Sequence, residues 1–242
     1  MPQRSVVYQA QAAKLEDLAK RYPIPEAVTL LKTMGEVKAA KPYKKGFRPR
    51  KGFDQTVELV MFLGIDPKQS DQMIRGAVSL PKGIGKTKRV IAFCPEDLAG
   101  EAKAAGAAEA GAEELIKKVS DGWMDFDLAV AHPSVMGKVG KLGRILGPSG
   151  KMPSPKSGTV TPNIVQAVKE YSAGKLEYRN DKGGNIHAVV GKMSFSVEDL
   201  TANIEAFIGH IRRAKPSTAK GQYIKRACVS GTMTPSIQLD VS

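Results

Sequence analysis

The segment from Gly143 to Thr161 has the composition of a surface that binds phosphate. It reads Gly-Arg-Ile-Leu-Gly-Pro-Ser-Gly-Lys-Met-Pro-Ser-Pro-Lys-Ser-Gly-Thr-Val-Thr, which combines glycines and prolines with three cations and no acid. Because glycine and proline at this density disfavour both a helix and a central strand, we expect an ordered connector. Its side chains Arg144, Lys151 and Lys156 would then face outward, where they could contact the phosphates of a nucleic acid.

The net charge of +13 is distributed unevenly along the chain. Counting Lys, Arg, Asp and Glu gives +10 for residues 1–93, −6 for residues 94–128 and +9 for residues 129–242. A polyanion that docks on one face favours such segregation, because each neutralised phosphate releases condensed counterions. Nucleic acid is therefore the leading class of partner.

A second basic segment lies between Lys38 and Lys51. It holds seven cations, two prolines, one glycine and no acid, so it cannot bury a core. It is either an additional anchor for RNA or a solvated loop, and we favour the anchor. The candidate contacts in this segment are Lys44, Lys45, Arg48, Arg50 and Lys51.

Two segments stand where a nucleotide-binding loop could lie, and neither has the glycines that such a loop requires. Gly83-Ile84-Gly85-Lys86-Thr87 resembles a phosphate-binding loop, but Leu80 stands where the Walker pattern needs a glycine. The predicted strand 88–93 is followed by Cys94-Pro95-Glu96-Asp97, which offers no glycine for a pyrophosphate to approach. We expect no catalytic residue and no cofactor, and a nucleotide-dependent enzyme remains the alternative function.

The residues that could bind a metal or form a disulfide are isolated from one another. Cys94 and Cys228 lie far apart in the sequence, and His132, His187 and His210 have no partners at metal-ligand spacing. No apolar run approaches the roughly 18 residues of a membrane span, and the amino terminus lacks a secretory signal. These features predict a soluble cytosolic protein with reduced thiols, no metal and no membrane partner.

The two ends of the chain have the pattern of an α+β domain. Alternation from Phe53 to Leu63 predicts a strand that buries Val57, Leu59, Met61 and Leu63. Further elements predicted near the ends are helices at 14–22, 25–34 and 197–213, strands at 75–80, 176–179 and 186–190, and a strand pair within 222–241 that turns near Gly231.

The middle of the chain alternates strands with helices. Strand signals at Val90–Phe93, Leu115–Ile116 and Leu128–Ala131 are interleaved with helical segments after Pro95 and Pro133, which is typical of parallel βαβ units. A further helix is expected at 163–172. The predicted fold is a discontinuous α+β RNA-binding domain formed by residues 1–83 and 175–242, with an inserted Rossmann-like α/β domain at residues 84–174.

The segment 143–161 closely resembles the signature of the large-subunit ribosomal protein L1 family, bacterial type, which reads roughly G-R-I-L-G-P-R-G-L-M-P-N-P-K-x-G-T-V-T. The resemblance extends over nearly all of the chain. It implies the same split-domain fold with a hinge at the two crossings. Other landmarks that follow in the same order are Phe53-Asp54-x-Thr56-Val57-Glu58, Gly64-Ile65-Asp66-Pro67, Leu80-Pro81-Lys82-Gly83, Tyr178-Arg179-Asn180-Asp181-Lys182 and Thr232-Met233.

The resemblance also implies which residues contact ribosomal RNA. Matched by position they are Phe53, Thr56, Glu58, Asp181, Lys182, Thr232 and Met233. Threonine hydroxyls and a carboxylate can hydrogen-bond ribose 2′-hydroxyls and base edges, while Phe and Met offer apolar surface to riboses and unstacked bases. Read from composition alone, Asp181 and Lys182 belong to a hairpin turn, and only the resemblance adds an RNA contact.

The function implied by the resemblance is that of a structural, non-enzymatic constituent of the large ribosomal subunit. Such a protein binds 23S-type rRNA at a mobile stalk near the exit site, assists release of deacylated tRNA and represses its own mRNA. Free of the ribosome it is expected to be a monomer. The inserted domain would present a basic, tRNA-facing surface made by Lys86, Lys88, Arg89, Lys138, Lys141 and Arg144.

The chain departs from the family pattern at several positions. Thr234 replaces a glycine after Thr232-Met233, which puts the geometry of that turn in doubt. Within the signature, Ser149 replaces Arg, Lys151 replaces an apolar residue and Ser154 replaces Asn. The four residues from Gly147 to Gly150 also match the G-x-x-G loop of KH domains, a weak signal because prolines follow where a helix should.

Overall fold

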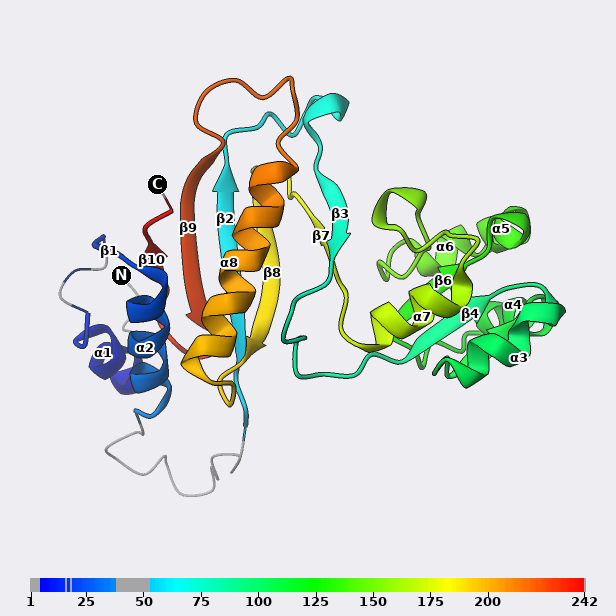
Figure 1. Cartoon of the computed structure of the whole chain (residues 1–242), viewed down its shortest axis with the longest axis horizontal. Coiled ribbons are helices and arrows are strands. Elements are labelled where there is room, and N and C mark those ends of the chain that lie inside the picture. The colour runs from blue at the N-terminus through cyan, green and yellow to red at the C-terminus, as the bar shows by residue number, and fades with distance from the viewer. Residues whose placement is uncertain (1–4, 16, 18, 38–52, 242) are drawn as a thin grey trace. The chain divides into compact units, whose positions relative to one another are not determined.

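The computed structural model describes residues 5–15, 17, 19–37 and 53–241, and these residues form two compact units (Figure 1). Unit 1 takes in the described residues of Met1–Ile74, Leu80–Ile84 and Arg179–Ser242, and unit 2 takes in Arg75–Ser79 and Gly85–Tyr178. Both units mix helices with strands, and unit 2 contains a parallel sheet. That the two units are separately folding, hinged domains stays a prediction.

Unit 1 is built on a five-stranded sheet whose strand order is β1-β10-β9-β2-β8. The central strand β2 pairs antiparallel with β9 on one side and β8 on the other, and β1 runs parallel to β10 at one edge. The strands are β1 (Arg21–Tyr22), β2 (Thr56–Leu63), β8 (Asn185–Lys192), β9 (Ile224–Gly231) and β10 (Ile237–Leu239). The helices are α1 (Val6–Ala12), α2 (Ile24–Gly35), α8 (Val197–Arg213) and the 3-10 turn η1 (Ser70–Gln72).

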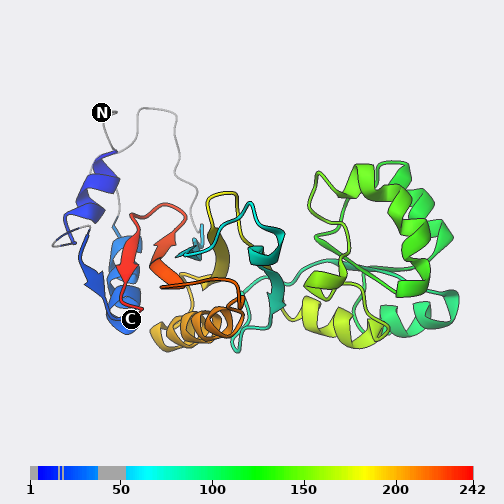
Figure 2. The same cartoon turned by 90° about the horizontal axis from the view of Figure 1, so that it is seen from above.

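One face of this sheet is covered by α2 and α8, and Figure 2 shows both helices on the same side of the strands. Alternation sends the apolar residues of β2 to that face, where Val57, Leu59, Met61 and Leu63 are fully buried, as the sequence predicts. On the opposite face of β2, Glu58 and Phe62 are exposed, whereas Thr56 and Val60 are half-buried. Among the described residues, α2 and α8 pack on the other side of the sheet, so we call this the uncovered face, and it gives unit 1 a surface for a partner.

The amino-terminal prediction was only half right. The helix expected at 25–34 is confirmed as α2, but the helix expected at 14–22 is wrong: α1 spans Val6–Ala12, and Arg21–Tyr22 form β1. The hydroxyl of Ser5 accepts a hydrogen bond from the N–H of Tyr8 and so fixes the start of α1. Tyr22 precedes a proline, and residues before proline favour the extended conformation.

Unit 2 contains a three-stranded parallel sheet in the order β5-β4-β6, with helices on both faces. Strands β4 (Val90–Phe93) and β6 (Leu128–Ala131) are buried at every position, as expected for a parallel sheet. The remaining elements are β3 (Arg75–Val78) paired with β7 (Leu176–Arg179), β5 (Glu109–Gly111), α3 (Glu96–Ala104), α4 (Glu113–Ser120), α5 (Met136–Val139), α6 (Gly143–Leu146), α7 (Ile164–Ser172), and the 3-10 turns η2 (Pro133–Val135), η3 (Gly140–Leu142) and η4 (Pro155–Ser157).

One prediction for the middle of the chain was wrong. Leu115 and Ile116 belong to helix α4, and the strand of that βα unit is β5, Glu109–Gly111. Glutamates in the first turn of α4 and lysines in its last turn favour the helix through its dipole. Residues 75–79 and 175–178 group with unit 2 and Ile84 groups with unit 1, whereas the expected division was 1–83 with 175–242 and 84–174. The division into domains stays a prediction.

Candidate nucleic-acid interface

The predicted contacts at the start of β2 meet the turn that follows β9. Val57 pairs with Gly231 in the ladder between the two strands. Beyond that pair, the N–H of Thr56 donates to Oγ1 of Thr232 at 3.1 Å, and the same hydroxyl donates to the carbonyl of Thr56 at 3.3 Å. Segments 176 residues apart in the sequence are therefore fastened by the Thr232 side chain.

The side chains at this end of the sheet offer apolar and polar groups together. Phe53 and Met233 are 59% and 67% exposed, and the N–H of Met233 donates to Oε1 of Gln55 at 3.0 Å. Oγ1 of Thr56 accepts from the Lys192 ammonium at 2.8 Å, which leaves the hydroxyl proton of Thr56 available as a donor. Glu58 is exposed on the uncovered face. We name Phe53, Thr56, Glu58, Thr232 and Met233 the Thr232 cluster.

Thr234 closes the turn of this cluster with its own side chain. The N–H of Gly231 donates to Oγ1 of Thr234 at 2.8 Å, and the N–H of Thr234 donates to the carbonyl of Gly231 at 3.2 Å. Of the described residues, only glycines have positive φ, so threonine at 234 is not strained by the left-handed region. The substitution thus replaces backbone freedom with a hydrogen bond.

Asp181 and Lys182 lie at the other end of the sheet. The N–H of Leu63, the last residue of β2, donates to the carbonyl of Gly184, so their turn is seven strand residues, roughly 23 Å, from Thr56. Oδ1 of Asp181 accepts from the N–H groups of Gly183 at 2.8 Å and Asn185 at 2.7 Å. Hydrogen bonds from Asn185 and Gly183 hold the pKa of Asp181 below its usual value. Asp181 thus serves its turn, while Lys182 is exposed.

The glycine- and proline-rich signature is not a uniform connector. Its first four residues, Gly143–Leu146, form helix α6, which is contrary to the prediction, and Leu146 is fully buried against the sheet. The composition that excludes a helix begins only at Gly147. Residues 147–150 are exposed, as is Arg144. The predicted outward display therefore applies to the first half of the signature.

Lys151 instead points into unit 2. Its ammonium donates to the carbonyl oxygens of Met124 at 3.1 Å and Phe126 at 2.5 Å and lies 4.8 Å from the centroid of the Phe126 ring. The family signature has an apolar residue at this position, and the aliphatic stem of a lysine can likewise be buried while its ammonium is hydrogen-bonded. The geometry gives Lys151 a structural role, while the side chain of Lys156 lies outside the described part of the chain.

The second half of the signature is held by buried hydroxyls. Oγ1 of Thr159 accepts from the N–H of Ser154 at 2.8 Å and donates to its carbonyl at 3.1 Å. The hydroxyl of Tyr171 donates to the carbonyl of Ser157 at 2.6 Å, and burial raises the pKa of Tyr171. Ser157 and Thr159 are both buried. These bonds fix the path of the segment, so its polar residues serve the fold of unit 2.

Most cations expected to face tRNA in unit 2 have internal partners. Burial lowers the pKa of Lys88, whose ammonium donates to the carbonyl of Lys175 at 3.1 Å. Lys141 and Arg144 are exposed. Exposed ion pairs contribute little free energy, so an incoming phosphate could compete for their cations. These pairs join Lys86 to Asp127 at 3.6 Å, Arg89 to Asp125 at 2.6 Å and Lys138 to Glu113 at 2.6 Å.

The basic segment from Lys38 to Lys51 lies outside the described residues. The RNA contacts expected in this segment, Lys44, Lys45, Arg48, Arg50 and Lys51, stay predictions.

One structural residue was missed by the sequence reasoning. Asn203, fully buried on α8, accepts from the N–H of Lys82 at 3.1 Å and donates to the carbonyls of Gly83 at 2.9 Å and Val190 at 2.8 Å. It therefore ties the segment Leu80–Ile84 to β8. A polar residue in the buried stripe of a predicted helix was the available signal.

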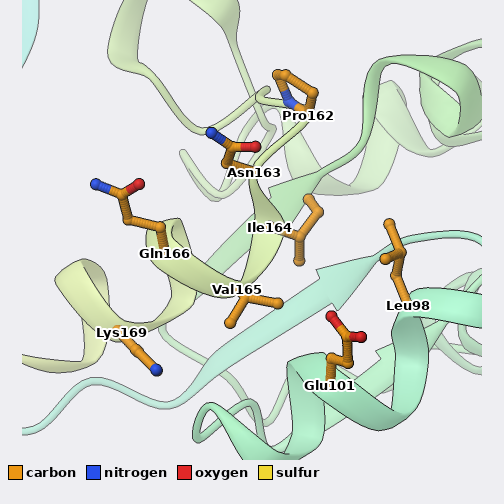
Figure 3. Close-up of a pocket in the computed structure, with 8 residues that line it drawn as sticks. All are labelled: Leu98, Glu101, Pro162, Asn163, Ile164, Val165, Gln166 and Lys169. Carbon is orange, nitrogen blue, oxygen red and sulfur yellow. The ribbon is translucent and has the colours of Figure 1, made fainter.

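The geometry of unit 2 does not favour a nucleotide site. Helix α3 begins after β4 with Pro95 as its N-cap and with Glu96 and Asp97 in its first turn, so carboxylates stand where a phosphate would need N–H groups. A cavity of about 410 Å³ opens between α3 and α7 (Figure 3). It is lined by Leu98, Glu101, Pro162, Asn163, Ile164, Val165, Gln166 and Lys169.

The described residues add little support for metal or membrane binding. They contain no group of three or more His, Cys, Asp or Glu placed to hold a metal ion. None of their helices combines the length and apolar character needed to span a membrane. Cys94 is buried, Cys228 is half-buried, and both are free thiols.

Comparison with known proteins decides the family. The model of the "Ribosomal protein L1p/L10e family" matches residues 40–235. The chain belongs to the ribosomal protein L1p/L10e family. It is 48% identical to the large ribosomal subunit protein uL1 of Saccharopolyspora erythraea over 240 residues, which cover 99% of this chain and 94% of that protein. The uL1 protein of Clavibacter sepedonicus is likewise 48% identical, over 99% of this chain and 98% of its own.

Membership in the L1p/L10e family confirms the resemblance inferred from the signature. The curated relatives are ribosomal proteins of bacteria, so the chain is a ribosomal protein and not an enzyme. The nucleotide-dependent enzyme considered as the alternative is thereby set aside.

Proposed function

We propose that this L1-family protein is a structural component of the large ribosomal subunit that binds 23S-type rRNA through the Thr232 cluster. The observation that carries the proposal is the bond between Thr232 and the backbone of Thr56. It assembles two exposed apolar side chains, an available hydroxyl proton and a carboxylate at one end of the uncovered face of the sheet. No rearrangement is needed to form this surface.

Each group in the cluster has a chemical role toward RNA. Phe53 and Met233 pack against riboses or an unstacked base, and the Thr56 hydroxyl donates to a ribose 2′-hydroxyl or base acceptor. Glu58 accepts from a 2′-hydroxyl or an exocyclic amine. Because the 2′-hydroxyl is the group that distinguishes RNA from DNA, such a surface selects RNA.

The finer parts of the proposal rest on family membership. We infer that the protein sits at the mobile stalk near the exit site and works on cytoplasmic ribosomes. Units 1 and 2 act as two hinged domains there, and unit 2 follows deacylated tRNA through Arg144 and Lys141 and helps release it. The same Thr232 cluster would bind an rRNA-like element in the protein's own mRNA and repress its translation, and the free protein would be a monomer.

Binding of an rRNA transcript by purified variants tests the central proposal. Phe53→Ala should weaken affinity about 5- to 100-fold, since one aromatic contact to a base contributes about 1–3 kcal/mol. Met73→Ala is a matched control, because Met73 is also 59% exposed but belongs to another segment of unit 1. Equal affinity of Phe53→Ala and wild type would remove Phe53 from the interface.

Crosslinking in cells, followed by sequencing of the bound RNA, identifies the partner directly. Large-subunit rRNA should dominate the recovered sequences, with the protein's own message as a minor species. Recovery of unrelated RNA in place of rRNA would contradict the assignment.

A further inference from the structure

We propose that the uncovered face of the unit 1 sheet has a second RNA contact, centred on Phe62, that stacks an unpaired nucleotide of the RNA held by the Thr232 cluster. This inference rests on the proposed function, because it takes RNA as the ligand of this face. We name Phe62, Asn185, Lys225 and Arg226 the Phe62 platform.

The platform is an aromatic ring surrounded by polar and cationic groups. Phe62 is 40% exposed on a face where a core-forming residue has no reason to stand. In the sheet it lies opposite Asn185 of β8 and Arg226 of β9. The ammonium of Lys225 lies 5.2 Å from the centroid of the Phe62 ring. An exposed ring beside cations is the arrangement that binds single-stranded nucleotides, since the base stacks and the cations meet its phosphates.

The loops around the platform add charge of the same sign. The N–H of Gly64 donates to the carbonyl of Tyr223 at 2.7 Å, and the N–H of Leu63 donates to the carbonyl of Gly184 at 3.0 Å. The loop before β9 and the turn before β8 therefore both meet the end of β2. The exposed lysines in these loops are Lys182, Lys215 and Lys220.

The acids in the neighbouring turns are engaged by backbone groups. The carboxylate of Asp181 accepts two N–H groups of its turn, and that of Asp66 accepts from the N–H of Lys68 at 3.1 Å. The exposed cations of the platform and its loops outnumber these two acids, so the local charge favours a polyanion over an uncharged apolar partner. RNA, with both a π surface and phosphates, satisfies the ring and the cations together.

Phe62 faces the same side of the sheet as the Thr232 cluster. Residues at even spacing along a strand share a face, and Phe62 is six residues, roughly 20 Å, beyond Thr56. One folded RNA can therefore touch both ends of the sheet. The flexible Lys225 side chain can leave the ring for a phosphate when a base takes its place.

Three substitutions of Phe62 in the full chain test the stack, with the rRNA transcript of the proposed function as the probe. Phe62→Ala and Phe62→Leu should each weaken affinity about 5- to 100-fold, while Phe62→Trp should bind within about threefold of wild type. The leucine variant keeps apolar bulk and the tryptophan variant keeps a ring. The proposal would be overturned if the alanine, leucine and tryptophan variants all bound the transcript with the same affinity.

Salt dependence and crosslinking test the cations and the location. Arg226→Gln should lower the slope of log affinity against log salt by about 0.7–0.9, whereas Lys103→Gln, an exposed charge on α3, should not. A transcript carrying 5-iodouridine should crosslink to Phe62 on irradiation. If Phe53→Ala weakens binding but Phe62 neither crosslinks nor matters, only the second contact is refuted. If wild type ignores the transcript, the proposed function is refuted and the platform with it.

Discussion

Thr232→Val separates the scaffolding role of the Thr232 hydroxyl from the rest of the cluster. Valine is nearly isosteric with threonine but lacks the oxygen that accepts from the N–H of Thr56 at 3.1 Å and donates to its carbonyl at 3.3 Å. A hydrogen bond contributes a net 0.5–1.5 kcal/mol, and the longer bond goes to a carbonyl that already accepts from the N–H of Thr232. We therefore expect a loss of about 1–1.5 kcal/mol of local stability.

The same loss should appear in RNA binding, because a loosened turn must be ordered again when RNA binds. One to 1.5 kcal/mol corresponds to a roughly 5- to 12-fold weaker affinity, with an unchanged salt slope since no charge is removed. Hydrogen exchange of the Thr232 and Met233 amides should accelerate in the free protein by a similar factor. Fluorescence would not serve here, because the sole tryptophan, Trp123, belongs to unit 2.

Thr232→Ser is the matched control for this experiment, since serine keeps the oxygen and loses only a methyl group. It should bind within about twofold of wild type. The reasoning would be refuted if the serine variant bound as weakly as the valine variant, or if the valine variant exchanged its amides at the wild-type rate.

Three further predictions concern neighbouring features. Thr234→Gly restores the family residue but removes the hydrogen bond to Gly231 and adds backbone freedom, so affinity for the rRNA transcript should fall about fivefold. Thr234→Ser keeps the hydroxyl and should bind normally, and wild-type affinity of the glycine variant would contradict the prediction. Lys151→Met leaves two carbonyl oxygens without their donor, so it should destabilise unit 2 by about 2 kcal/mol in urea unfolding followed by Trp123 fluorescence. If the variant instead lowered the slope of log RNA affinity against log salt by about 0.7–0.9, Lys151 would be a phosphate ligand. The pKa of Asp181 is lowered in the fold, so its turn should contribute stability above the usual pKa of 3.8 and lose it as pH falls through the folded value; a carboxyl NMR titration midpoint at or above 3.8 would contradict this.

The sequence predicted elements whose apolar spacing is strong. β2 alternates over eight residues, and α8 carries a buried stripe over seventeen, so both could be placed from periodicity. The short strand β5 could not, because Glu-Ala-Gly has no apolar signal and is ordered only by pairing with β4. The helix expected at 14–22 was wrong because the end of that segment is extended. Tyr22 precedes Pro23, which favours extended backbone, and Arg21–Tyr22 form β1 by pairing with β10.

The candidate site was predictable only in part for a different reason. The family resemblance indicated that Thr232 could contact RNA, but the bond of its hydroxyl to Thr56 depends on pairing between segments 176 residues apart. Lys151 and Asp181 show the reverse case, in which a charged residue in a suggestive motif is engaged by backbone groups. Composition gives the charge of such residues, and only the fold gives their direction.

The most direct test of the central claim compares a folded rRNA fragment with the same fragment carrying 2′-deoxyriboses at the contacted positions. A sheet end that reads ribose hydroxyls should bind the deoxy fragment at least tenfold more weakly at one salt concentration, and Thr56→Val should remove most of that difference. Equal affinity of wild type for the two fragments would contradict the account.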